Sequence, residues 1–430
     1  MNYFKCKKIT HQQLLDWLKK EVKLSLGCTE PIAIAYAAAV AAKYLNAPIL
    51  KITGNISENL YKNAMGVTIP GTSYCGVTLA AAIGAIGGNA DADLEVLKDI
   101  TATQITEAYI FNESGNVCLN AVDATDFIFI DITLYSLSDQ CRVVIQGSHT
   151  NVTEVYINNI KQILVRDLIA ANDSGVLPEF SLNDAFKFVT DVAAKDIMFM
   201  LKSAEINTAL SDEGQRKNYG LNVSGALSQA RKNGFISTDL LSQMLINTTA
   251  ASDARMGGAP LPAMSNYGSG NQGITVTMPV VTLARHLNTD DETLARALAL
   301  AHLAAISIHM RYTRLSALCA ASTAAMGAAA GMSWLLTQDF QTISYAVSNM
   351  ISDISGIICD GASNSCAMKV STATACAFKS VLMAQQNSVA GERDGIVSCD
   401  VEGSINNLCK LVLSPMRQTD KEIISIMTRK

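Results

Sequence analysis

The chain has 430 residues, of which 49% are hydrophobic and only 17% charged. Its formal net charge is −5, and no basic run is present, so the electrostatic footprint of a nucleic-acid-binding protein is absent and a small-molecule substrate is favoured. Because about a quarter of residues are charged in a typical globular domain, the low charged fraction indicates extensive burial, within the fold or between subunits of a homo-oligomer.

The N-terminal segment predicts an amphipathic helix. Thr10 suits the N-cap position, and hydrophobic residues follow at helical spacing from Leu14 until Gly27 ends the pattern. Residues 12–17 are too polar for the core of a signal peptide. We therefore expect a cytoplasmic protein.

A second helix is expected to begin at Pro31 and to run through alanine-rich sequence to Tyr44, because proline suits the first helical turn. Cys28 would then lie in the break just before this helix. A short β-like run follows at residues 49–56, and a helix of small residues ends at Gly87 and Gly88.

Three segments predict an antiparallel meander: residues 126–135, 142–146 and 152–157. Beyond about residue 160 the pattern becomes helical almost to the end. The predicted fold class is therefore α+β, with a mainly helical catalytic body formed by residues 1–44 and 161–430. Residues 45–160 form a smaller portion that contains the antiparallel sheet.

A charge-free stretch at residues 315–338 is long enough to suggest a transmembrane helix. Its residues are mainly Ala, Ser, Thr and Gly, and neither an aromatic belt nor a basic flank brackets it. Small residues instead let helices approach closely. We interpret the stretch as the central helix of a packed bundle and expect no membrane span.

The chain has eleven cysteines, and in a reducing compartment they are not expected to form disulfides. No Cys-x-x-Cys pair is present, which argues against zinc-ribbon and thioredoxin sites. Cys359 and Cys366 stand at the two ends of a glycine-bearing loop that could bring two thiolates to one metal centre. Their spacing matches none of the common ferredoxin patterns, so on spacing alone two structural cysteines is the plainer interpretation.

Three segments resemble the L-cysteine desulfidase family, which is related to the catalytic alpha part of bacterial iron–sulfur L-serine dehydratases: residues 27–31, 268–273 and 359–369. The spacing of Cys319, Cys359 and Cys366 is also similar to that of the family's three cluster ligands. The resemblance implies that these cysteines hold a [4Fe–4S] cluster and that Cys28 matches the family's proposed catalytic cysteine. We expect the three sulfurs to converge.

These roles are chemically sensible. Three protein ligands leave one iron open to act as a Lewis acid on the leaving group. Cys28 would remove the Cα proton as a base, because a helix N-terminus lowers the pKa of a thiol. Elimination from L-cysteine would yield pyruvate, ammonia and hydrogen sulfide.

The segment from Gly268 to Gly273 matches the dinucleotide pattern G-x-G-x-x-G. That pattern requires a preceding parallel strand, and the proline-containing residues 257–262 do not suit one. We predict instead an anion-binding loop at a helix start, where Ser269, Gly270 and Asn271 hold the substrate carboxylate.

A second polar segment lies in the connection between two predicted strands. It contains Ser148, His149, Thr150 and Asn151, and its Ser-His-Thr resembles a substrate-contacting motif of the iron–sulfur dehydratases. Substrate binding and a simple polar turn are equally compatible with the sequence.

Other functions stay open at this point. An L-serine dehydratase would use the same chemistry on a hydroxyl group, and a non-catalytic iron–sulfur sensor would need a partner-binding element that the sequence does not indicate. Pyridoxal phosphate chemistry would need a Schiff-base lysine. Five basic residues near the cluster cysteines have no role assigned by sequence: His302, His309, Arg311, Arg314 and Lys369.

Overall fold

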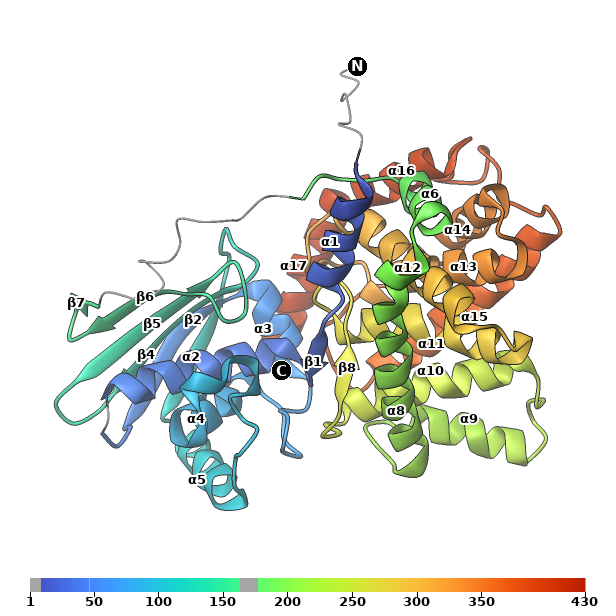
Figure 1. The fold of residues 1–430 in the computed structure, drawn as a ribbon. Coiled ribbons are helices and arrows are strands. Elements are labelled where there is room, and N and C mark those ends of the chain that lie inside the picture. The colour runs from blue at the N-terminus through green and yellow to red at the C-terminus, as the bar shows by residue number, and fades with distance from the viewer. Residues whose placement is uncertain (1–8, 46, 163–176, 430) are drawn as a thin grey trace.

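A computed structural model describes residues 9–45, 47–162 and 177–429 of the chain. Figure 1 shows a sheet covered by helices at one end of the molecule and a larger helical body at the other, with β1 and β8 between them. The α+β class predicted from the sequence is confirmed. Cys6, one of the eleven cysteines, lies outside the described residues.

The N-terminal elements agree with the sequence pattern. Helix α1 (His11–Glu21) begins at a capping box in which Thr10 and Gln13 satisfy each other's backbone N–H groups. Strand β1 (Leu24–Leu26) pairs antiparallel with β8 (Pro262–Met264). Helix α2 (Thr29–Leu45) begins two residues earlier than predicted. Pro31 is compatible with that start because the N–H groups of a first turn have no intrahelical partner.

The sheet has the strand order β3-β2-β4-β5-β6-β7. Its strands are β2 (Lys51–Ser57), β3 (Val117–Val122), β4 (Phe129–Tyr135), β5 (Gln140–Gln146), β6 (Val152–Ile157) and β7 (Ile160–Lys161). Strands β4 to β6 form the predicted antiparallel meander, whereas β2 and β3 are parallel. In β4, buried and partly buried positions alternate, as the sequence pattern indicates.

Helices cover this sheet and share one hydrophobic cluster with it. They are α2, α3 (Glu58–Met65), α4 (Val77–Gly87), the 3₁₀ segment η1 (Ala90–Glu95) and α5 (Ala102–Glu113). Residues 32–45 of α2 therefore pack with the sheet. The division of the chain into domains stays a prediction.

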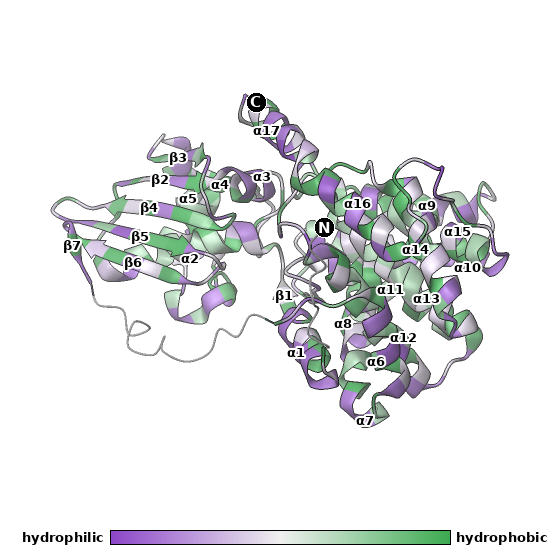
Figure 2. Ribbon diagram, turned by 90° about the horizontal axis from the view of Figure 1, so that it is seen from above, coloured by the Kyte–Doolittle hydropathy of each residue, from purple (hydrophilic) through white to green (hydrophobic). Residues whose placement is uncertain are grey.

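The helical body follows in chain order. Its elements are α6 (Leu182–Asp191), α7 (Ala194–Ile197), η3 (Met198–Met200), α8 (Leu201–Arg216), α9 (Val223–Lys232), α10 (Leu240–Met256), α11 (Gly270–Leu287), α12 (Asp291–His309), α13 (Ala320–Thr337), α14 (Phe340–Ile354), α15 (Cys366–Gln385), α16 (Val401–Leu413) and α17 (Pro415–Thr428). Helix α17 reaches back towards the sheet, where it contacts α3 (Figure 2).

Helix α13 lies at the centre of this body and contacts α11, α12, α14 and α15. A Cβ atom added to Gly327 would lie 2.4 Å from the carbonyl oxygen of Ala301, so only glycine permits this close approach. The predicted central helix is confirmed. Across the described ranges, no helix is long and apolar enough to cross a membrane.

Candidate active site

A pocket of about 350 Å³ lies between the sheet part and the helical body. The sheet side contributes Cys28 and Glu30 at the start of α2, Asn63 of α3, and Ser148 and His149 of the β5–β6 connection. The helical body contributes Arg255, Tyr267, Ser269, Asn271, His309, Arg314, Cys319, Cys359 and Cys366. Segments far apart in the sequence thus form one site.

Cys28 is a buried, protonated thiol. Its Sγ donates to Oε2 of Glu30 at 2.9 Å, and the side chain is 4% exposed. Burial and the Glu30 carboxylate raise the pKa of Cys28 well above its usual value, although Arg255 opposes them. The expected lowering of this pKa by the helix N-terminus is therefore wrong, because desolvation outweighs the helix dipole. Glu30 accepts the hydrogen bond from the thiol, and this role was not predicted from the sequence.

Arg255 was missed by sequence reasoning. It is 6% exposed, its Nη2 donates to the carbonyl oxygen of Gly27 at 3.0 Å, and its Nε has no partner. No ion pair joins Arg255 to an acidic side chain within the described residues. A buried guanidinium without a counterion favours an anion in the adjoining pocket.

The glycine loop positions this arginine. Helix α11 starts at Gly270, and a Cβ there would lie 2.1 Å from Nε of Arg255, so Gly270 leaves room for the guanidinium. The Ser269 hydroxyl accepts from the backbone N–H of Gln272 and caps the helix. Asn271 lines the pocket and accepts a hydrogen bond from Ser252. Whether these residues hold a carboxylate stays a prediction.

The β5–β6 connection divides into two pairs of residues. Ser148 and His149 line the pocket, and burial lowers the pKa of His149. Thr150 and Asn151 are not among the pocket-lining residues. The Asn151 amide instead donates to the carbonyl oxygen of Gln146 and shapes the turn.

The three cysteines named by the resemblance line one wall of the pocket. The backbone N–H of Cys319 donates to Ile357, and that of Cys359 donates to Ala317, so a short antiparallel bridge aligns the two chain segments. Cys366 begins α15, and Cys319 is the N-cap residue of α13.

This donor set fits an iron–sulfur cluster. Two helix N-termini and Lys369 place positive potential beside the thiols. Burial, with contributions from Cys359 and Cys366, raises the pKa of Cys319 to about 12, so metal must replace the thiol proton. The described residues contain no set of three or more His, Cys, Asp or Glu side chains arranged around a single ion. A four-iron cluster binds its cysteines at separate corners, so this finding does not oppose the assignment.

Arg314 also lines the pocket, but its charge is already paired. Its guanidinium contacts both oxygens of Glu21 at 2.8 and 3.1 Å and lies over the ring of Tyr267, with Cζ 4.1 Å from the centroid. The pair forms a fixed wall, whereas Arg255 is a buried guanidinium without an acidic partner among the described residues.

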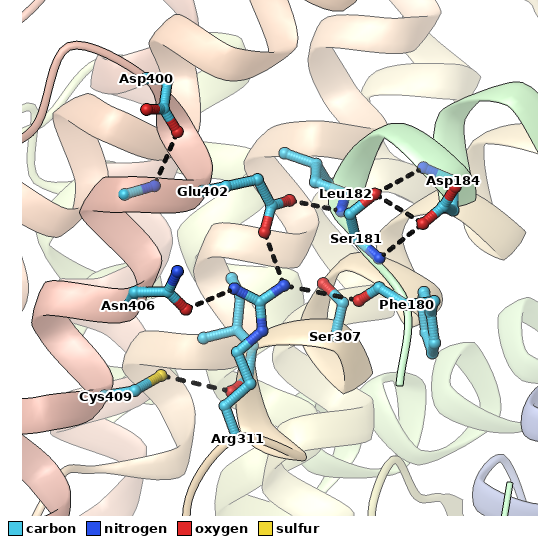
Figure 3. Close-up of polar contacts among 12 residues, drawn as sticks. Phe180, Ser181, Leu182, Asp184, Ser307, Arg311, Asp400, Glu402, Asn406 and Cys409 are labelled. Carbon is cyan, nitrogen blue, oxygen red and sulfur yellow. Dashed lines mark hydrogen bonds and ion pairs between the residues drawn. The ribbon is translucent and has the colours of Figure 1, made fainter. Parts of the chain in front are cut away.

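Arg311 has a structural role. Figure 3 shows its guanidinium bound to Glu402, to the Asn406 side chain and to the Phe180 carbonyl, which joins α16 to the chain before α6. Nearby, Cys409 donates to the Ile308 carbonyl, as expected of a buried structural cysteine (Figure 3).

Two further basic residues also bond to the protein. Lys369 forms an ion pair with Asp360 and donates to the Ile358 carbonyl at 2.9 Å. His302 uses both ring nitrogens, on Asn266 and Thr277.

Lys62 of α3 links the segment that contains Cys359 to the sheet and to α17. Its side chain is fully buried, pairs with Asp420 and donates to the carbonyl oxygen of Cys359 at 3.3 Å. A buried lysine needs such a partner, so the position of Cys359 depends on the docking of the C-terminal helix.

One known protein family matches most of the chain. The family described as "Serine dehydratase alpha chain" matches residues 91–425. The chain belongs to the serine dehydratase alpha chain family. This family makes it a lyase of the kind that performs β-elimination on amino acids. The pocket cysteines Cys319, Cys359 and Cys366 all lie within the matched region.

The alignments with two relatives cover almost the whole length of this chain. A UPF0597 protein of Klebsiella pneumoniae is 61% identical over 416 residues, covering 97% of this chain and 98% of the relative. The UPF0597 protein YhaM of Escherichia coli O127:H6 is 50% identical over 424 residues, covering 97% of each chain.

Proposed function

We propose that this protein is an iron–sulfur-dependent lyase that converts L-cysteine to pyruvate, ammonia and hydrogen sulfide. The observation that carries the proposal is the meeting of three cysteine thiols, the Cys28–Glu30 pair and an uncompensated arginine around one pocket. The resemblance of residues 27–31, 268–273 and 359–369 to L-cysteine desulfidases supports the choice of substrate.

Arg255 is the group best suited to the substrate carboxylate. Its buried charge lies in the wall next to Cys28 and has no acidic partner in the part of the chain that the structure describes. A carboxylate bound there would form charge-assisted hydrogen bonds in a partly desolvated site. The start of α11, with Asn271 beside it, adds favourable potential.

Cys28 and Glu30 handle the Cα proton in this proposal. In the resting state the proton lies on Sγ and is shared with Oε2 of Glu30. Transfer to the carboxylate leaves a thiolate that can take the proton from Cα, and the pair can return it later. General base catalysis of this kind contributes roughly 10²–10⁴-fold.

Cys319, Cys359 and Cys366 would hold the cluster. When bound, it supplies an open iron that acts as a Lewis acid towards the substrate leaving group. A fourth permanent ligand would close that position, so Cys28 is assigned to proton transfer. A Cys28→Ala protein should keep its iron and its visible spectrum while losing exchange of the substrate Cα proton with solvent. Loss of iron in this variant would overturn that assignment.

An L-serine dehydratase is the second candidate, because the family shown by the comparisons carries that name. Anaerobic assay of the reconstituted protein with L-cysteine and L-serine side by side separates the two. The proposal predicts a higher kcat/KM for L-cysteine, with sulfide and pyruvate formed in equal amounts. A higher kcat/KM for L-serine would replace it with the dehydratase.

A further inference from the structure

His309 lies in the pocket wall and carries a buried ring nitrogen without a hydrogen-bond partner. It is the last residue of α12, is 2% exposed and lines the pocket, yet its Nε2 has no hydrogen-bond partner. An unpartnered polar atom at this degree of burial is uncommon in a well-packed protein. Because His309 lines the pocket, a bound ligand is the group that can supply the missing partner.

A series of buried hydrogen bonds determines which ring nitrogen of His309 carries the proton. The series begins at the backbone carbonyl oxygen of His302, which can only accept. The amide group of Asn266 that lies 3.2 Å from this oxygen must therefore be its NH₂ end. Oδ1 of Asn266 then faces Nε2 of Gln272 at 2.7 Å and accepts from it. This orientation turns Oε1 of Gln272 towards Nδ1 of His309, at 2.7 Å.

Since Oε1 of Gln272 can only accept, Nδ1 of His309 must carry the proton. Nε2 of His309 is therefore a bare lone pair, and burial lowers the pKa of the ring to about 3, which keeps it neutral at physiological pH. Tyr267 and Tyr312 lie against the ring at centroid distances of 4.8 and 4.5 Å and hold its orientation. The pocket thus contains a fixed, uncharged hydrogen-bond acceptor.

The two carboxylates that line the pocket already accept hydrogen bonds from the protein. Both oxygens of Glu21 bind Arg314, and Oε2 of Glu30 accepts from Cys28 and Thr29. A ligand carboxylate has no proton to donate to Nε2 of His309. An α-ammonium group has three protons that it can donate.

We propose that Nε2 of His309 accepts a hydrogen bond from the α-ammonium group of the amino-acid ligand and so selects ligands that carry an α-amino group. This inference rests on the proposed function for its ligand class. It differs from that function in concerning recognition of the amine, and its tests need neither turnover nor the cluster.

The first test is the tautomer of His309, measured by long-range ¹H–¹⁵N correlation on protein labelled at its five histidines. His309 should show protonated Nδ1 and bare Nε2. His302 is an internal control of opposite tautomer, because its Nδ1 accepts from Asn266 and its Nε2 donates to Thr277. L-alanine, which has no leaving group, should shift the Nε2 resonance of His309. A protonated Nε2, or no shift at saturating L-alanine, would overturn the inference.

The second test compares L-alanine with propionate, which has the carboxylate but no amine, by calorimetry. His309→Asn keeps a polar group near the former position of Nδ1 and has none near the former position of Nε2. His309→Gln instead places a polar group near the former position of Nε2. We expect His309→Asn to weaken L-alanine binding by roughly ten- to a hundredfold, as for a hydrogen bond to a charged group, and to leave propionate binding unchanged. His309→Gln should recover most of the L-alanine affinity.

Equal weakening of both ligands in His309→Asn, or unchanged L-alanine affinity, would contradict the role in amine binding. These outcomes are separate from failure of the lyase proposal, which would appear as absence of elimination by the cluster-loaded wild type despite correct amine recognition. The tautomer measurement on the wild type also remains decisive if a variant does not fold.

Discussion

The sheet and the helical body both contain fully buried side chains, but these differ in chemistry. The buried positions of β4 are all aliphatic, namely Ile130, Ile132 and Leu134. In the body, α11 and α12 bury polar residues such as Gln272 and His302. Buried polar groups need partners, and most of those in the body find them within the protein.

The exceptions at the pocket are informative. Nε of Arg255 and the Nε2 atoms of His149 and His309 have no partner, and all three residues line the pocket. The hydrophobic pattern therefore builds the sheet, while the pocket wall holds buried polar atoms that a ligand can satisfy. Substitutions in the two regions should therefore change the stability of the sheet and the chemistry of the pocket separately.

The largest effect is expected at the junction of the two regions. Asp420→Ala removes the partner of the fully buried Lys62 and should lower the free energy of unfolding by about 3–5 kcal/mol. Iron binding should weaken too, because Lys62 contacts the Cys359 carbonyl. Asp123→Ala is the control, since that carboxylate pairs with Lys421 at the surface and should cost about 0–1 kcal/mol. Chemical denaturation measures both, and equal costs would contradict the account.

A change within the sheet should affect stability alone. Ile132→Ala leaves a cavity at a fully buried position and should cost about 2–5 kcal/mol. Affinity for L-alanine should stay at the wild-type value in the folded protein. Ile160→Ala, at an exposed site in β7, should cost little. A large loss of affinity in folded Ile132→Ala would show that the two regions are not separable.

Local sequence signals predicted the secondary structure, whereas features that depend on the tertiary fold were not predicted. Alternation in residues 126–135 and the cap at Thr10 are local signals, and the elements they predict are present. The pKa of Cys28 was predicted in the wrong direction because its burial and the approach of Glu30 depend on the tertiary fold. Arg255 belongs to no motif, and its contact with Gly27 spans 228 positions.

Acid should destabilise the body through its buried histidines. Burial lowers the pKa of His302 and His309 to about 3, below the ordinary value of 6.5, so the unfolded chain binds protons first as the pH falls. Each histidine should remove about 1.4 kcal/mol of stability per pH unit between about pH 6 and 3. His309→Gln should reduce this slope in a denaturation series over pH. An unchanged slope would show that His309 does not remain neutral in the folded state.

The smallest effect is expected from filling the space beside the Arg255 guanidinium. Gly270→Ala places a Cβ against the guanidinium and should weaken propionate binding by roughly tenfold, or about 1.4 kcal/mol. The Nδ1-protonated tautomer of His309 should persist, which separates carboxylate binding from amine binding. Unchanged propionate affinity would argue against Arg255 as the carboxylate site.

The central claim is that the pocket cysteines form the site of an iron-dependent elimination. The most direct measurement is iron content together with pyruvate release from L-cysteine, after anaerobic reconstitution of the wild type, Cys366→Ser and Cys118→Ser. Cys118 is exposed on β3 and serves as the matched control. We predict that Cys366→Ser loses both iron and pyruvate release, while Cys118→Ser keeps both. Full iron content and turnover in Cys366→Ser would contradict the claim.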